Sequence, residues 1–294
     1  MGQSSNVKKV INKFDAPYLR KASGFRNPTD FWNNIIANDK NVEKYNDAVK
    51  ENNKTLYEAY NALVLYDKQT QTYEYTTTEY NDVVNRLVDD LGIGELASKN
   101  PVKVIMDGTI NASMDYTGQM RIYKGCFMNL TYNELLAVCA HEMAHYSCAH
   151  VMTSVWKTAK KQKKNRLWAE IGAGLMIGAA AAASGYGAYN GQDVSHFNSI
   201  IANSDILFGA AYANADDATI RYKYRYNRNE ESEADIIAYR FMEQMGYGGE
   251  NVLSLLKKIK KLYGDTPAGK YDDHPTILFR TQVISAMMSG YSGK

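Results

Sequence analysis

The stretch His141-Glu142-Met143-Ala144-His145 places two histidines four positions apart, with a glutamate directly after the first. On a helix, residues i and i+4 project from one face, so both imidazoles can reach one zinc ion. Glu142 then lies beside the metal, where its carboxylate can take a proton from water. Thr131 and Glu134 have capping-box spacing, which predicts a helix that begins there and runs to about Met152.

A catalytic zinc site needs a third protein ligand and an open position for water. His150 is the nearest candidate, but at about 100° per residue it faces the side of a continuous helix opposite His141. Cys139 and Cys148 also lie off the required spacing, so we interpret them as small packing residues. The third ligand is therefore expected elsewhere in the chain.

A second predicted helix, over residues 229–245, offers that ligand. Glu231 and Asp235 are four positions apart and share a face, whereas Glu233 points elsewhere. Glu231 can bind the metal while Asp235 holds a ligating imidazole or a basic partner. Taken alone, this acidic stretch is more typical of a solvated helix face, and it is the HExxH motif that favours a ligand here.

Composition limits the other classes of function. The chain has 294 residues, of which 45% are hydrophobic and 22% charged, ample for a buried core in one large domain or two small ones. A net charge of +2 gives no electrostatic reason to expect a nucleic-acid partner. The three cysteines are too few, and too odd in number, for a disulfide framework.

The chain order predicts a mainly helical α+β protein. Helical patterns fill residues 1–95, and short strands are expected within 102–124, just before the histidine helix. The uncharged stretch 171–183 is too short to span a bilayer, which needs about 20 residues. We favour a protein-packed helix there, with peripheral membrane contact through residues 157–189 as the alternative.

Several spaced motifs resemble metallopeptidase family 48, the HtpX-like and CAAX prenyl endopeptidase-related gluzincins. They include Asn111-Ala112, the stretch 118–125, the HEMAH motif and Glu231-Ser-Glu-Ala-Asp235, and they end with His274-Pro275 followed by Arg280. His150 matches a histidine often found after HExxH in the family. Asn227 stands where the family pattern has serine, and the first hundred residues lie outside the resemblance.

The resemblance implies a zincin-like domain with a small antiparallel sheet beside the HExxH helix, which we expect over residues 96–294. Residues 1–95, which the resemblance does not cover, are expected to pack on this domain as a helical region. It implies Zn²⁺ held by three residues, His141, His145 and Glu231. Glu142 would be the general base and Asp235 would lie behind the ligands, where Arg280 could pair with it.

The resemblance also places two further elements at the site. His274 would approach the metal, to stabilise the oxyanion or to block the open position. Asn111 and Ala112 would lie on the edge strand to which an extended substrate adds.

We therefore expect a zinc metalloendopeptidase acting on protein or peptide substrates. The alternative is a chaperone-like or binding protein that retains the zinc site with little proteolysis; a zinc hydrolase acting on a non-peptide bond is a further alternative. The start of the chain lacks the apolar core of a secretory signal, and the resemblance favours the bacterial cell envelope or periplasm.

Overall fold

The computed structural model of the chain describes residues 5–20, 24–51, 53–54, 75–76, 79–115, 117–154, 156, 228–264 and 275–292. The chain divides into two compact units. One comprises Met1–Asn52, Tyr66–Thr153 and Arg225–Lys294, and the other Asn53–Leu65 and Ser154–Tyr224. Nearly all of the second unit lies outside the described residues, as do the stretch 171–183 and His274.

The first unit is α+β and mainly helical, as expected from the sequence. Its helices are α1 (Ser5–Phe14), α2 (Pro28–Asn38), α3 (Lys40–Lys50), α5 (Asn81–Leu91), α6 (Gly94–Lys99), α7 (Lys124–Asn129), α8 (Tyr132–Ser147), α12 (Arg228–Gln244), α13 (Glu250–Tyr263) and α14 (Ile277–Met288), with a short 3-10 turn η1 at Pro17–Leu19. Its strands are β1 (Tyr75–Thr76), β2 (Lys103–Ile105), β3 (Ala112–Met114) and β4 (Met120–Tyr123).

The four strands form one sheet in the order β1-β2-β4-β3. The expectation of an antiparallel sheet was wrong for one pair, because β2 and β4 run parallel. After β2 the chain crosses to the far side of β4, forms β3 and turns back into β4, and these two reversals restore the original direction. Strand β3 is thereby left at one edge of the sheet.

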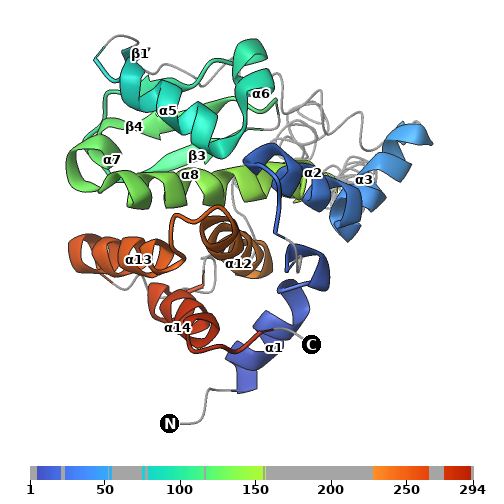
Figure 1. The fold of residues 1–294 in the computed structure, drawn as a ribbon. Coiled ribbons are helices and arrows are strands. Elements are labelled where there is room, and N and C mark those ends of the chain that lie inside the picture. Colours follow the sequence, from blue (N-terminus) through green and yellow to red (C-terminus); the bar gives the residue numbers. More distant parts are fainter. Residues whose placement is uncertain are drawn as a thin grey trace, which may run out of the picture. The chain divides into compact units, whose positions relative to one another are not determined.

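Helix α8 lies between two layers (Figure 1). It packs against β3 on one side and against α12 and α13 on the other, and α14 packs against both α12 and α13. The hydrophobic core joins these elements to the N-terminal helices, since Ile11 of α1 and Phe31 of α2 belong to the same buried cluster as Ala140 of α8 and Phe241 of α12. The predicted division of the chain into an N-terminal region of residues 1–95 and a catalytic domain of residues 96–294 stays a proposal.

The predicted capping box begins α8. Thr131 accepts a hydrogen bond from the backbone N–H of Glu134, and Glu134 accepts one from the N–H of Thr131. The Glu134 carboxylate also accepts a hydrogen bond from Ser254 of α13 at 2.6 Å. One buried carboxylate thus starts α8 and holds α13 against it.

Helix α8 ends earlier than predicted. It stops at Ser147, and Ala149 has a φ of 51°, in the left-handed region that non-glycine residues rarely adopt. The chain changes direction there before a further helical turn begins at His150. The expectation of one continuous helix to Met152 was therefore wrong.

Replacing Thr131 with alanine should lower the free energy of unfolding by about 1 kcal/mol, because the cap of α8 loses its acceptor. Thr131→Ser, which keeps the hydroxyl, should lose much less. Urea denaturation of both variants measures the difference. Equal unfolding midpoints for Thr131→Ala and the parent chain would contradict this role of the cap.

Candidate metal centre

Three donor side chains converge between α8 and α12. The Nε2 atoms of His141 and His145 are 3.1 Å apart. Glu231 places Oε2 at 3.6 Å from the His141 Nε2 and Oε1 at 3.5 Å from the His145 Nε2. All three residues are buried, and their ligand atoms form a compact group.

This triangle fits a tetrahedral metal ion. Donors at 2.0–2.1 Å from a zinc ion stand about 3.3 Å from one another in tetrahedral geometry. The three observed separations of 3.1, 3.5 and 3.6 Å lie close to that value. Two histidines and one glutamate are also the ligand set of a group of catalytic zinc sites that keep a fourth position open.

The charges around His141 favour a cation at the same point. The Nδ1 atom of His141 lies 3.0 Å from an oxygen of Asp235. Burial alone would lower the pKa of His141, but Asp235 and Glu231 outweigh burial and raise this pKa to about 10. The surrounding carboxylates therefore stabilise positive charge here, which a divalent cation would supply.

Asp235 and Glu231 are both held by Arg280 of α14. The guanidinium donates two hydrogen bonds to Asp235, each 2.7 Å long, and its third nitrogen lies 3.4 Å from the Glu231 carboxylate. Such a bidentate contact fixes the orientation of a carboxylate. Although burial opposes it, Arg280 also keeps the pKa of Asp235 below its usual value. Asp235 is therefore an anion that holds His141.

Glu142 lies beside the triangle and outside it. Burial raises the pKa of its buried carboxyl group to about 7, although the backbone N–H of Met114 in β3 favours the ionised form. A carboxylate with a pKa near neutrality can both take up and release a proton. The Met114 contact had no signal in the sequence, because it involves the backbone of a neighbouring strand.

Among the strands that the structure describes, none pairs with the outer edge of β3, which lies next to Glu142. Two bonds, from the Tyr123 N–H to the Asn111 carbonyl and from the Asp115 N–H to the Gln119 carbonyl, fix which residues of β3 face β4. In an antiparallel pair the alternate residues, Ala112 and Met114, then direct their backbone groups away from β4. Ala112 thus lies on the open edge as the resemblance implied, whereas the Asn111 carbonyl is already bonded.

His150 lies outside the donor triangle but contacts it. Its Nδ1 atom is 2.9 Å from the Nδ1 atom of His145, and its Nε2 atom is 3.2 Å from the Glu233 carboxylate. The continuous-helix geometry did not foresee this contact, because the chain turns at Ala149. Glu233 points away from the metal ligand atoms, as predicted, and toward His150.

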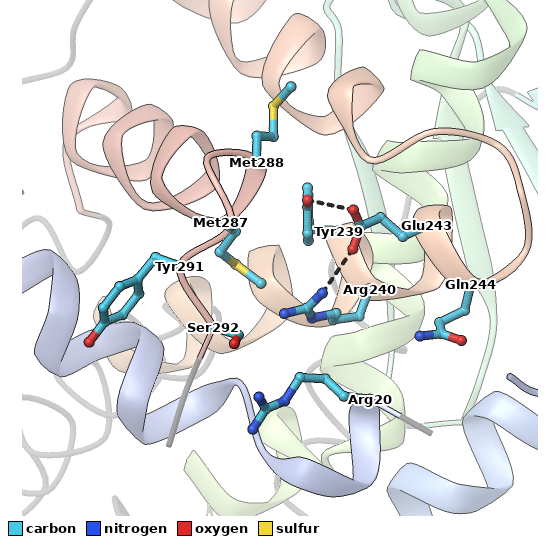
Figure 2. Close-up of a pocket in the computed structure, with 10 residues that line it drawn as sticks. Arg20, Tyr239, Arg240, Glu243, Gln244, Met287, Met288, Tyr291 and Ser292 are labelled. Atoms are coloured by element: carbon cyan, nitrogen blue, oxygen red, sulfur yellow. Dashed lines mark hydrogen bonds and ion pairs between the residues drawn. The ribbon is translucent and has the colours of Figure 1, made fainter. Parts of the chain in front are cut away.

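A separate pocket of about 390 Å³ lies further along α12 (Figure 2). Residues from η1, α12 and the end of α14 line it, among them Arg20, Tyr239 and Arg240. Arg240 is already bound by Asp15 through two hydrogen bonds of 2.8 Å. None of the metal-donor residues lines this pocket.

A helix-borne HExxH pair beside a glutamate from a second helix is the arrangement typical of gluzincin metallopeptidases. The sequence profile of peptidase family M48 matches residues 74–288. The chain belongs to this family.

Individual relatives are distant. The chain is 25% identical to the metalloprotease LoiP of Escherichia coli over 213 residues, 72% of each chain. It is 26% identical to the metalloprotease YcaL of the same species, over 65% of this chain and 64% of that one. It is 27% identical to a putative beta-barrel assembly-enhancing protease of Vibrio cholerae, over 56% of this chain and 30% of the relative.

Glu231→Gln should weaken metal retention, because a neutral amide is a poorer ligand than a carboxylate. We expect dialysed protein to lose most of its bound metal. Glu250→Gln, an exposed change on α13, is the control and should retain metal. The measurement is the metal content of each dialysed protein by elemental analysis. Full metal occupancy in Glu231→Gln would point to another third ligand.

Proposed function

We propose that the protein is a zinc-dependent endopeptidase. The observation that carries this proposal is the buried triangle of His141, His145 and Glu231 with Glu142 beside it. Membership of family M48 and relatives named as metalloproteases support the same activity. Zinc is the metal that best suits two imidazoles and a carboxylate in tetrahedral geometry.

When bound, zinc would polarise the scissile carbonyl and lower the pKa of a water molecule. Glu142 is placed to accept the proton of that water, and afterwards to pass it to the nitrogen of the leaving amine. The Met114 N–H, which favours the ionised form of Glu142, would help to orient the carboxylate for this exchange. Asp235, held by Arg280, keeps the His141 imidazole in place.

The substrate proposed is an extended segment of protein or peptide. It would pair with the open edge of β3, where Ala112 and Met114 direct their backbone groups, and would cross the face of α8 near Glu142. Backbone pairing recognises no particular side chain, so an unfolded region of a protein can enter anywhere along its length. This geometry favours an endopeptidase over an enzyme that trims chain ends.

Two parts of the proposal concern residues outside the described ranges. We retain His274 as a residue that approaches the metal from the C-terminal side, either to stabilise the oxyanion or to gate the site, with Pro275 buried directly after it. We retain residues 157–189 as the candidate for peripheral membrane contact. Among the helices that the structure describes, none is long and apolar enough to cross a membrane.

A location in the bacterial envelope also stays a proposal. All three relatives come from bacteria, and one is named for enhancing beta-barrel assembly. That name describes a protease, which supports protein substrates for the present chain as well. The present chain spans only 30% of the length of that protein.

Glu142→Gln should abolish cleavage of a denatured protein while metal content stays normal, because the amide cannot take a proton from water. We expect a loss of at least about a hundredfold in rate. The control is Glu95→Gln, an exposed change on α6 whose side chain is 87% accessible. Unchanged cleavage by Glu142→Gln would refute the mechanism, and an inactive but substrate-binding parent protein would favour the chaperone-like alternative.

A methylation scan of a peptide substrate tests the binding edge. Single N-methyl groups placed along the peptide should reduce kcat/KM at alternate positions only, because every second N–H of an added strand faces β3. The measurement is kcat/KM for each methylated peptide. Strand addition would be contradicted if kcat/KM were the same for every methylated peptide, or if methylation lowered it equally at adjacent positions.

A further inference from the structure

A line of three buried polar residues runs from the metal centre into the protein. His145 is followed by His150, through the 2.9 Å contact between their Nδ1 atoms, and His150 by Glu233, through a 3.2 Å contact. Neither histidine is accessible to solvent, and Glu233 is only 8% exposed. Buried polar groups of this kind need partners, so each contact must have one donor and one acceptor.

The positions of the protons follow from the role of His145. If its Nε2 atom binds the metal, a neutral imidazole carries its proton on Nδ1. The Nδ1 atom of His150, 2.9 Å away, must then be the acceptor. The proton of His150 is left on Nε2, which donates to the Glu233 carboxylate. Every atom along the line then has a single compatible state.

The backbone is strained at the point that brings His150 to this position. Ala149 adopts the left-handed conformation, which is unfavourable for an L-residue other than glycine. This turn ends α8 after Ser147 and directs His150 back against His145 instead of around the helix. Such local strain persists where the surrounding contacts require one geometry.

A competing arrangement uses the same residues. Cys148, His150 and Glu233 also form a compact buried group that could hold a metal ion. If a second ion bound the Nε2 atom of His150, both His145 and His150 would be metal ligands through Nε2. Each neutral imidazole would then need a proton on Nδ1, but the hydrogen bond between the two Nδ1 atoms has room for only one proton. One imidazole would become an anion. Burial, with Glu233 and Asp39, also raises the pKa of the Cys148 thiol, which favours its neutral form.

We propose that His150 and Glu233 are positioning residues that fix the tautomer and orientation of the metal ligand His145. This inference rests on the proposed metal site and extends it to residues that touch neither metal nor substrate. Outer partners of metal ligands are typically worth a factor of 10–100 in metal affinity. His150 and Glu233 should contribute to zinc affinity on this scale.

The variants His150→Gln and His150→Leu distinguish a hydrogen-bonding role of His150 from a packing role. The amide oxygen of glutamine can accept from His145 while its nitrogen donates to Glu233, so His150→Gln should bind zinc within a few-fold of the parent. His150→Leu fills similar space without either bond and should bind roughly 10–100-fold more weakly. Glu233→Gln keeps an acceptor but loses its charge, and should fall between the two.

Zinc dissociation constants from competition with a chromophoric chelator are the readout, with thermal melting of the metal-free proteins as the companion measurement. A merely structural role would lower the melting temperature of every variant and leave zinc affinity unchanged. The proposal would be overturned if His150→Leu bound zinc as tightly as the parent, or if His150→Gln weakened zinc binding as much as His150→Leu. If His150→Leu does not fold, the zinc affinity of Glu233→Gln provides the test, and an affinity equal to that of the parent would overturn the proposal.

Cobalt substitution tests the competing arrangement. The proposal predicts one cobalt ion per chain and no near-ultraviolet band from a bond between thiolate and cobalt. A second ion whose thiolate band disappears in Cys148→Ser would make His150 a ligand and overturn the proposal. A parent protein that binds no metal at all would instead refute the metal site itself, so the two failures are distinguishable.

Discussion

Charge balance in the buried space between α8 and α12 is the constraint on which the rest of the structure depends. Glu231, Glu233 and Asp235 are all buried near the start of α12. Buried carboxylates are costly unless they are paired and hydrogen-bonded. Arg280 pairs with Asp235, His141 and His145 of α8 face Glu231, and His150, just after α8, faces Glu233. A divalent cation would complete the balance at His141, His145 and Glu231.

The surrounding fold keeps these groups in register. The capping box and Glu134 set where α8 begins and bind it to α13. Helix α14 carries Arg280 to the far side of the acids, and β3 carries the Met114 N–H to Glu142. The site is thus assembled from four elements, α8, α12, α14 and β3, and the hydrophobic core that joins those elements holds the donor atoms at their spacing.

Local signals predicted the parts of this arrangement that depend on neighbours in sequence. The capping box and the i,i+4 pairs on α8 and α12 rest on helical geometry alone, which is why the cap at Thr131 and the shared face of His141 and His145 could be predicted. The choice of Glu231 as a ligand rested in addition on the presence of the HExxH motif. The contact of Arg280 with Asp235 joins two distant helices, and only the family motifs indicated it. The parallel pairing of β2 with β4 depends on the order in which strands meet, which short strand patterns do not encode.

The contact between His145 and His150 was missed for a specific reason. A glycine or asparagine at position 149 would have signalled a left-handed residue and the end of the helix, but the chain has alanine there. With a continuous helix assumed, His150 appeared on the wrong face. The structure instead makes it the partner of His145, one of the proposed metal ligands, so a strained residue without a sequence signal shapes the site.

We propose that one zinc ion, held by His141, His145 and Glu231, is required for peptide cleavage. The most direct measurement is a titration of the metal-free protein with zinc while the cleavage of a denatured protein is followed. The account predicts that cleavage is absent without metal and rises to its maximum at one zinc ion per chain. Cleavage that persists after complete metal removal, or that never appears on addition of zinc, would contradict it.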